Sequence, residues 1–431
     1  MRNFYSQLVL VPVYLFIVLA ISSCRSDLDE LTPGSGALIF ENFVAIGDGY
    51  IAGYSNWGLY EFSQENSLPN LLSQQFSLVR EIDFDQPILS GSGTGYNELE
   101  SLSSSACPDI ANTPIFRSIP SSITWNNNVS FLGPFNNKGI PGLKVDQLRD
   151  TSLVQTNPFF QRISPNSGNT YLQEAQNIEA DLCLVWLGSQ EILQFSSFNR
   201  FGIDQDFDAD EFRLAYTSLM DSMLANSSSS ILVANIPPIL SFPYFTSISS
   251  SYIQEENCIT STLPIYISTL SVDGEKIVRV ATEKDHILLP ALNEIGKEEN
   301  GVRVGLSPES PLPDSWVMDE TESSTLQSRI NVMNSIISAM VSELNADFNR
   351  QRLFQVDMSS AFEALEEGIT EDGIELNNQY INGGVFSLDG LYFTPRGNAY
   401  IANVFIEYVN RSFAASIPLI SLADYPAVFF P

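Results

Sequence analysis

The feature that most constrains the fold is a series of short apolar runs that alternate with longer segments of helical spacing. The run from Leu182 to Leu187 contains no charged or strongly polar residue, which is typical of a β-strand buried on both faces of a sheet. Further strands are predicted at 43–46, 231–234 and 353–356, and amphipathic helices at 68–76, 212–223, 326–344 and 399–409. Strands that alternate with helices predict an α/β fold of three layers, α/β/α, with a parallel sheet in the middle.

The same alternation bears on the domain organisation. We find no internal repeat, and no second series of elements that would mark another domain. We therefore expect residues 39–431 to form a single domain that carries large insertions near 80–130 and 240–320.

The N-terminus has the pattern of an export signal. An apolar run over 8–21 follows Arg2 and is too short to span a bilayer comfortably. It ends in Ile21-Ser22-Ser23-Cys24, which resembles the lipobox of bacterial lipoproteins, where the cysteine is lipidated and becomes the first residue. Residues 1–24 are therefore predicted to be a lipoprotein signal peptide and residues 25–38 a polar tether. The expected location is the outer membrane of a Gram-negative bacterium, facing either the periplasm or the surface, and an uncleaved anchor helix is the alternative.

The net charge limits the partners. The chain has 20 basic and 51 acidic residues, a formal net charge of −31. Nucleic acid is excluded as an expected partner, because affinity for it comes from Lys and Arg neutralising phosphates. Anionic lipid headgroups would also repel this chain, so attachment to a membrane should depend on the lipid at Cys24.

Cysteine and histidine usage gives little sign of a metal site or cofactor. Cys183 lies in an apolar run and is expected to be buried, whereas Cys107 and Cys258 lie in polar segments and could form a disulfide in an oxidising compartment. The chain has one histidine, His286, so a zinc site is not expected. The acidic stretch 204–210 imitates the start of a calcium loop but lacks the glycine and the glutamate that such a loop needs. We expect no metal and no cofactor.

Four segments carry motifs where chemistry is expected, beyond the carboxyl ends of parallel strands. They are Gly47-Asp48-Gly49-Tyr50, Asn137-Lys138-Gly139-Ile140-Pro141-Gly142, Gly188-Ser189-Gln190-Glu191 and Asp389-Gly390-Leu391-Tyr392. In this order they resemble the Gly-Asp-Ser, glycine, Gly-x-Asn-Asp and Asp-x-x-His blocks of the SGNH (GDSL-type) hydrolases. Segments 234–238 and 330–336 resemble a lipoprotein branch of that family, so the resemblance spans nearly the whole mature chain. It implies the SGNH-type fold, with a flavodoxin-like parallel sheet.

The resemblance also implies how the site departs from an active one. In the family the serine attacks an ester, the histidine takes the serine proton, the aspartate orients that histidine, and a glycine N–H and an asparagine amide hold the oxyanion. Here the serine, asparagine and histidine positions are Gly49, Gln190 and Tyr392, while Gly142 and Asp389 are retained. A glycine has no nucleophile, and a phenol of pKa about 10 is no general base near neutrality.

Three side chains remain as a possible pocket at these strand ends, namely Asp48, Tyr50 and Glu191. Together with Asp389, the carboxylates could bind a cation or sugar hydroxyls, or supply an acid and a base to a glycosidase-like reaction, or they could simply hold their turns. The prediction is an exported lipoprotein without catalytic activity that binds a glycan, a lipid or a protein, through the former cleft or through the aromatic insertion around Phe242. The alternative is an active carbohydrate or lipid ester hydrolase that uses a non-standard site.

Overall fold

The structure is a computed structural model. It describes residues 32–103, 113–123, 133–164, 168–176, 178–197, 207–226, 228–248, 264–270 and 274–429. The predicted signal peptide with Cys24, residues 25–31 of the predicted tether, and both Cys107 and Cys258 lie outside these ranges, so the predictions made for them stay predictions. Within the described ranges, no helix has the length and apolar character needed to cross a membrane.

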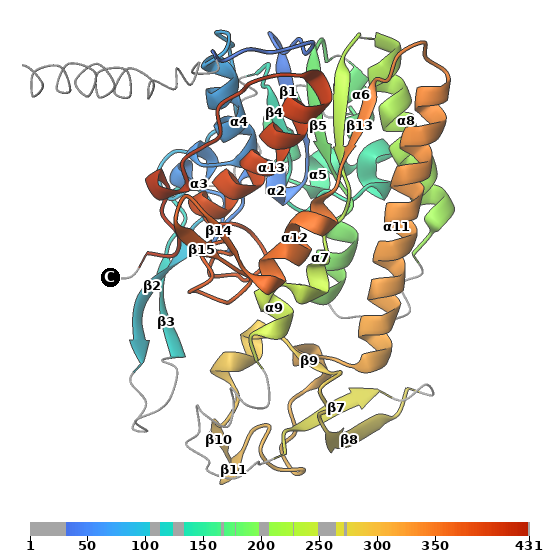
Figure 1. The fold of residues 1–431 in the computed structure, drawn as a ribbon. Helices are drawn as coiled ribbons and strands as arrows, with labels where there is room; N and C mark the ends of the chain where they lie inside the picture. The colour runs from blue at the N-terminus through green and yellow to red at the C-terminus, as the bar shows by residue number, and fades with distance from the viewer. Residues whose placement is uncertain are drawn as a thin grey trace, which may run out of the picture.

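A parallel sheet of five strands forms the centre of the molecule (Figure 1). In sheet order the strands are β13 (Leu353–Val356), β6 (Ser230–Ala234), β5 (Leu182–Trp186), β1 (Phe43–Gly47) and β4 (Asn137–Gly139). Numbered along the chain, this is the order 5-4-3-1-2, the doubly wound order of flavodoxin-like folds. Every residue of β1, β5 and β6 is buried, which explains why these strands are apolar apart from Ser230 at the start of β6.

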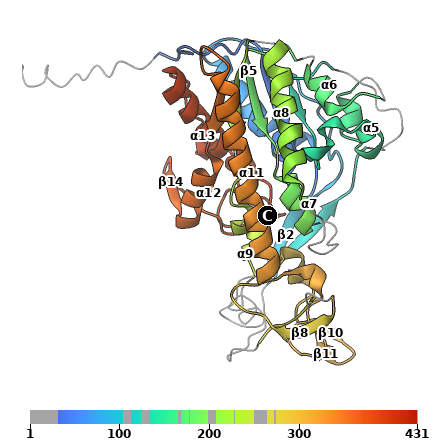
Figure 2. The ribbon, with the colours of Figure 1, turned by 90° about the vertical axis from the view of Figure 1, so that its right-hand side faces the viewer.

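Helices cover both faces of this sheet. Figure 2 shows α13 (Pro395–Phe413) and α8 (Ala209–Asn226) on opposite sides of β5. Helix α4 (Leu68–Ser77) packs against α13, whereas α6 (Tyr171–Gln176) and α11 (Glu320–Ala346) pack against α8. The predicted three-layer α/β/α arrangement is therefore confirmed, and so are the predicted strands and long helices that form it.

Local sequence signals fix where the long helices begin. Helix α13 begins as predicted, because the Thr394 hydroxyl accepts a hydrogen bond from Gly397 N at 3.0 Å and Pro395 occupies the first helical position. Helix α11 begins with a capping box, in which Asp319 and Glu322 each accept from the other's backbone N–H. These caps satisfy N–H groups that have no partner inside the helix.

Shorter elements connect or extend the three layers. Among the described residues, the remaining α-helices are α2 (Gly49–Ala52), α3 (Glu61–Glu65), α5 (Leu153–Thr156), α7 (Gln190–Ser197), α9 (Pro243–Thr246) and α12 (Met358–Glu367). Antiparallel pairs are formed by β2 (Tyr96–Ser103) with β3 (Thr113–Ile119), β7 (Tyr266–Leu270) with β8 (Lys276–Val280), β9 (His286–Ile287) with β12 (Val317–Met318), β10 (Glu298–Glu299) with β11 (Val302–Arg303), and β14 (Ile369–Glu371) with β15 (Ile374–Leu376).

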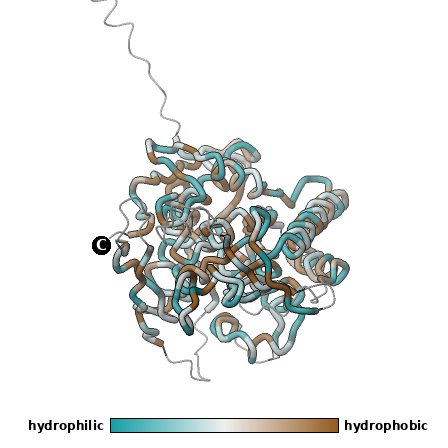
Figure 3. Tube along the Cα trace, turned by 90° about the horizontal axis from the view of Figure 1, so that it is seen from below, coloured by the Kyte–Doolittle hydropathy of each residue, from teal (hydrophilic) through white to brown (hydrophobic). Residues whose placement is uncertain are grey.

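Two groups of elements project from the edge of the sheet at which the parallel strands have their carboxyl ends. One is the β2–β3 hairpin, and the other is a lower body that contains β7 to β12 and lies beneath α9 and the N-terminal end of α11 (Figures 1 and 2). The lower body has its own small core of buried apolar side chains, which includes Ile248, Ile267, Leu312 and Val317. Figure 3 shows short hydrophobic and hydrophilic stretches alternating along the trace, as expected of elements that each bury one face.

Strand β5 also holds Cys183, the cysteine that the sequence predicts to be buried. Its side chain is buried, and burial raises the pKa of the thiol to about 12. The thiol is therefore a small hydrophobic group of the core, as predicted.

Candidate functional site

The candidate site lies where the chain order of the sheet reverses, between β1 and β5. These strands are parallel neighbours, and Gly47 at the end of β1 is paired with Trp186 at the end of β5. The loops that follow them therefore leave the same edge of the sheet, which is where ligands bind in doubly wound folds. Gly49 begins α2, directly after the first of these loops, and Gln190 begins α7, directly after the second.

The loop before α13 adds Tyr392 to this pair. A Cβ atom built on Gly49 would lie 2.6 Å from Cε1, 2.8 Å from Oη and 2.9 Å from Cζ of Tyr392. Separations below 3 Å are shorter than van der Waals contact, so the phenol ring fills the volume that a serine side chain at position 49 would need. Gly49 is buried and Tyr392 is only 8% exposed, which leaves the ring little room to move aside.

Gln190, where the sequence resemblance places an amide donor, completes the contact. Gln190, 2% exposed at the start of α7, donates a hydrogen bond from Nε2 to Oη of Tyr392 at 2.9 Å. The amide that the resemblance assigns to an oxyanion is thus bound to the phenol. Burial raises the pKa of Tyr392 well above its ordinary value, so the phenol stays protonated and offers neither a nucleophile nor a base.

Tyr50, the hydroxyl nearest to Gly49 in sequence, belongs to an aromatic cluster. Its ring stacks on Trp186 and on Phe393, each at 4.8 Å between centroids, and lies 5.3 Å from Tyr392. Tyr54 packs against the same Tyr392 ring at 4.8 Å. Tyr50 is 2% exposed, and burial raises the pKa of its hydroxyl well above its ordinary value. The site is therefore filled by rings at this point.

Asp389 holds the turn that carries Tyr392. Its carboxylate accepts hydrogen bonds from the backbone N–H groups of Leu391 and Tyr392 at 2.9 and 2.7 Å, and from Trp57 N at 3.2 Å. These bonds use both oxygens and fix the position from which the Tyr392 side chain projects. Asp389 therefore positions a tyrosine here and has no histidine to orient.

Gly142 lies in the loop after β4 with φ +78°, in the left-handed region that favours glycine. A Cβ on Gly142 would find its nearest neighbour at 4.0 Å, the side-chain nitrogen of Asn157. In contrast to Gly49, this position has open space in front of it. Gly142 therefore has the backbone conformation that a glycine allows and an open space beside it.

Two buried carboxyl groups lie under the strand ends. Asp48 is fully buried and accepts from Tyr50 N at 3.0 Å, whereas Glu191 is 9% exposed and accepts from Val145 N at 2.6 Å. Their other oxygens, Oδ2 of Asp48 and Oε2 of Glu191, have no hydrogen-bond partner among the described residues.

The protonation of this pair limits what it can do. Burial is the main cause that raises the pKa of Asp48 to about 8, opposed by the Tyr50 N–H and reinforced by Glu191. Burial likewise raises the pKa of Glu191 to about 7. Near neutrality both groups are therefore protonated to a large extent, and neutral acids are poor ligands for a cation. In the part of the chain that the structure describes, no group of three or more His, Cys, Asp or Glu side chains is arranged to hold a metal.

His286 lies in the lower body, on β9. Its Nδ1 lies 3.1 Å from the carbonyl oxygen of Phe245, and burial lowers its pKa. The contacts described for His286 connect it to α9, and none of them reaches Gly49 or Tyr392. The aromatic insertion around Phe242 is also inward-facing, since Phe242 and Phe245 are buried and Phe242 packs on Phe386.

The sequence patterns did not reveal the aromatic cluster. They also did not reveal a bracket of two hydrogen bonds between Asn334 and Ile236. Asn334 lies on α11. Its side-chain oxygen accepts a hydrogen bond from Ile236 N, and its side-chain nitrogen donates one to Ile236 O, each at 2.8 Å. This pair of bonds ties α11 to the loop after β6. The asparagine stood in a segment that resembles the family, but no periodicity assigns it a partner.

Comparisons with known proteins give little beyond the geometry. No protein-family model matches the chain, and no curated protein matches it. Among solved structures, the crystal structure of a possible lipase from Chitinophaga pinensis DSM 2588 is similar at 10% sequence identity and a TM-score of 0.33, over 87% of this chain and 99% of that one.

Proposed function

We propose that this chain is an exported, lipid-anchored protein with an SGNH-type scaffold that has lost serine-hydrolase chemistry and serves as a binding protein. One observation carries the proposal, namely that the Tyr392 ring occupies the volume of a side chain at Gly49 and is hydrogen-bonded to Gln190. The three positions that would supply nucleophile, base and oxyanion amide are thereby joined in a closed, unreactive contact.

The size of the expected loss supports this reading. Enzymes stripped of serine-triad members retain only about 10³- to 10⁴-fold acceleration over water, which comes from the oxyanion hole and binding. In this chain the amide of Gln190 is also engaged, so that even this residual contribution should be reduced. Ester hydrolysis by the family mechanism should be close to absent.

The N-terminus supports the proposed location. The segment Ile21-Ser22-Ser23-Cys24 follows an apolar run and precedes a polar stretch, as in bacterial lipoproteins. A body with a net charge of −31 has little electrostatic attraction for anionic membranes, so a lipid at Cys24 is the feature that would hold it there. The proposed binding role is to glycan, lipid or protein ligands at an outer membrane.

The test is an assay of purified residues 25–431 with aryl esters of several acyl lengths. We expect turnover no greater than that of the heat-denatured protein, because the described site contains no activated nucleophile. The matched variants are Tyr392→Phe and Gln190→Ala, which alter the site without changing the scaffold. The protein could instead hydrolyse esters faster than the denatured control, and either variant could abolish that turnover. This result would overturn the proposal and favour the alternative, an ester hydrolase with a non-standard site.

A further inference from the structure

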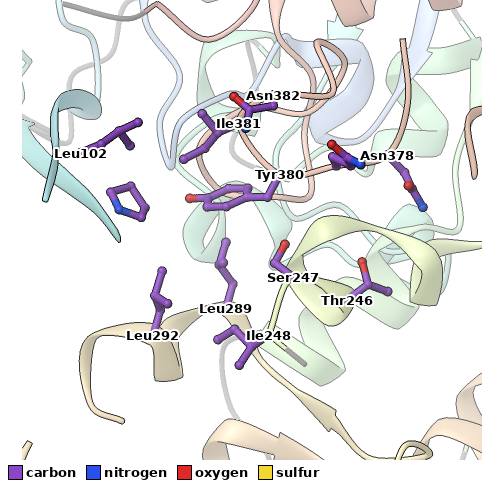
Figure 4. A pocket seen from close by; sticks show the side chains of 12 residues that line it. Leu102, Thr246, Ser247, Ile248, Leu289, Leu292, Asn378, Tyr380, Ile381 and Asn382 are labelled. Carbon is purple, nitrogen blue, oxygen red and sulfur yellow. The ribbon is translucent and has the colours of Figure 1, made fainter. Parts of the chain in front are cut away.

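A pocket of about 610 Å³ lies outside the Gly49–Tyr392 contact, where three parts of the molecule meet. The β2–β3 hairpin contributes Leu102, the lower body contributes η4 (Leu289–Asn293), and the loop before α13 contributes residues 378–382. Figure 4 shows the Tyr380 ring in the middle of the pocket, between Ile381 on one side and Leu289 on the other. This volume is within the range of small-molecule sites.

The lining residues that the structure describes are all uncharged. They are Leu102, Pro114, Thr246, Ser247, Ile248, Leu289, Leu292, Asn378, Gln379, Tyr380, Ile381 and Asn382. None of these carries a charge, although the chain has 51 acidic residues. A charged ligand would lose hydration on entering without gaining an ion pair, so the lining selects for a neutral one.

Most polar and apolar groups lie on different sides of the pocket, although Asn382 lies beside Ile381 (Figure 4). In Figure 4, Leu102, Leu292 and Leu289 lie on one side, while Ser247, Thr246 and Asn378 lie on the other. This arrangement matches a ligand with an apolar face and a polar edge. An acyl chain alone would leave the polar side unmatched.

The polar groups offer both donors and acceptors. Asn378 donates from Nδ2 to Ser241 O, which holds its amide in place, and the hydroxyls of Thr246 and Ser247 donate to carbonyls of their own helix. These hydroxyls therefore present lone pairs to the pocket, whereas Gln379 and Asn382 are exposed amides with donor hydrogens. Ligand hydroxyl groups, which donate and accept, can bond to all of these.

The backbone of the pocket loop is strained where the lining is formed. Ile381 has φ +64°, a conformation that is rare for a β-branched residue and costs about 1–3 kcal/mol. It is held there by burial in a small cluster with Leu99 and Leu388, and Tyr380 beside it donates from its hydroxyl to Leu388 O at 2.6 Å. The strained residue thus sets the directions of Tyr380 and Asn382, its two neighbours in the lining.

The pocket wall is also fixed to the loop that bears Asp389. A Cβ on Gly390 would lie 2.8 Å from Tyr244 N and 3.1 Å from Cδ2 of Leu289, so the lower body packs directly on this glycine. Tyr244 N donates to Gly390 O at 3.1 Å. The lining is therefore held in a preformed arrangement, which lowers the entropic cost of binding.

We propose that this pocket binds a neutral saccharide, with a sugar ring against Tyr380 and the leucine side, and with its hydroxyl groups on Asn378, Gln379 and Asn382. The inference rests on the binding role proposed above and names the ligand class and the site for it. Because the pocket lies outside the Gly49–Tyr392 contact, binding there does not require that contact to open.

The test is calorimetric titration of residues 25–431 with neutral tetrasaccharides of glucose, mannose, xylose and N-acetylglucosamine. A monoacylglycerol and an oligogalacturonate serve as the neutral-lipid and charged-saccharide arms. We expect at least one neutral tetrasaccharide to bind, and Gln379→Ala/Asn382→Ala to weaken that binding about tenfold or more through lost hydrogen bonds. The matched control is Gln327→Ala/Asn331→Ala, an exposed Gln–Asn pair on α11, which should leave the affinity unchanged.

Tyr380→Leu provides a second variant, which keeps an apolar side chain but removes the ring. The inference is overturned if no neutral tetrasaccharide binds, if the pocket variants bind as tightly as the control, or if the monoacylglycerol or the oligogalacturonate binds in preference. Melting temperatures without ligand show whether each variant is folded. This experiment measures saccharide binding, whereas the proposed loss of hydrolysis is tested by ester turnover. Each proposal can therefore fail without the other.

Discussion

The phenol ring of Tyr392 occupies the space directly in front of Gly49, with its Oη and Cε1 within 3 Å of where a Cβ would be. The two residues lie far apart in the sequence and meet because β1 and the turn held by Asp389 lead to the same edge of the sheet. A small residue at one position and a large one at the other are therefore a complementary pair. Changing one without the other should be costly.

The first prediction concerns this complementarity. Gly49→Ala should destabilise the protein by about 1–3 kcal/mol through overpacking, although alanine normally favours a helix such as α2. In a Tyr392→Leu background, which lacks the three ring atoms, the same change should cost at least about 1 kcal/mol less. Urea unfolding of the four proteins measures this coupling. Gly168→Ala is the control, because a Cβ there meets nothing within 4 Å. If Gly49→Ala costs as much stability in the Tyr392→Leu background as in the wild type, the packing argument is refuted.

The second prediction concerns pH. The pKa of Asp48 is raised by burial from 3.8 to about 8, so between these values the folded state binds more protons than the unfolded state. The free energy of unfolding should therefore be highest at low pH within this window and fall as pH rises toward about 8, and Glu191, with its pKa raised to about 7, acts in the same direction.

Asp48→Asn isolates the contribution of that carboxyl. The variant keeps a side-chain oxygen for Tyr50 N but cannot ionise, so its unfolding free energy should fall less steeply between about pH 5 and about pH 8, and it should exceed the wild type at the upper end. Asp221→Asn, an exposed change on α8, is the control and should keep the wild-type slope. A slope in Asp48→Asn as steep as the wild type would contradict the assignment.

The third prediction concerns the bracket between α11 and the loop after β6. Asn334→Ala removes both hydrogen bonds to Ile236 and leaves its backbone groups without that partner, so we expect a loss of about 2–3 kcal/mol. Asn331→Ala, one turn earlier on the exposed face of the same helix, should change stability by less than about 0.5 kcal/mol. Similar losses in the two variants, measured by chemical denaturation, would show that the bracket contributes nothing.

The fourth prediction concerns the anchor. When the full chain is expressed in a Gram-negative host, labelled palmitate should be incorporated and the protein should partition into the detergent phase. Cys24→Ala should abolish both the label and the partitioning, because the charge of the body gives it little other attraction for a membrane. Retention of membrane binding in Cys24→Ala would favour an uncleaved anchor helix over lipidation.

The sequence predicts the layered fold well for a physical reason. Strands buried on both faces, such as β5, must be apolar throughout, and helices that cover a sheet must show helical spacing, so both leave patterns that can be read directly. The sequence pattern does not predict strand β4, because this strand has only three residues, Asn137–Gly139, and they are largely polar. It pairs at the edge of the sheet through backbone groups, which the side-chain pattern does not record.

The candidate site was predictable in part. Motifs at strand ends identified Gly49, Gln190 and Tyr392 as positions to examine, but the pattern of residues cannot show that a ring fills the space at a glycine. That relation depends on the path of three separate loops. The pocket around Tyr380 was not predicted, because its lining comes from the hairpin, the lower body and the loop before α13, which no local pattern brings together.

We propose that the Tyr392 ring closes the site, and that positions 49, 190 and 392 lack the groups needed for ester hydrolysis. The measurement that tests it most directly is aryl-ester turnover by the triple variant Gly49→Ser/Gln190→Asn/Tyr392→His, beside the same variant with Gly49→Ala in place of serine. We predict turnover and labelling by a fluorophosphonate in the serine variant, and neither in the wild type nor in the alanine control. A triple variant that melts cooperatively but hydrolyses no more ester than the alanine control would contradict the account.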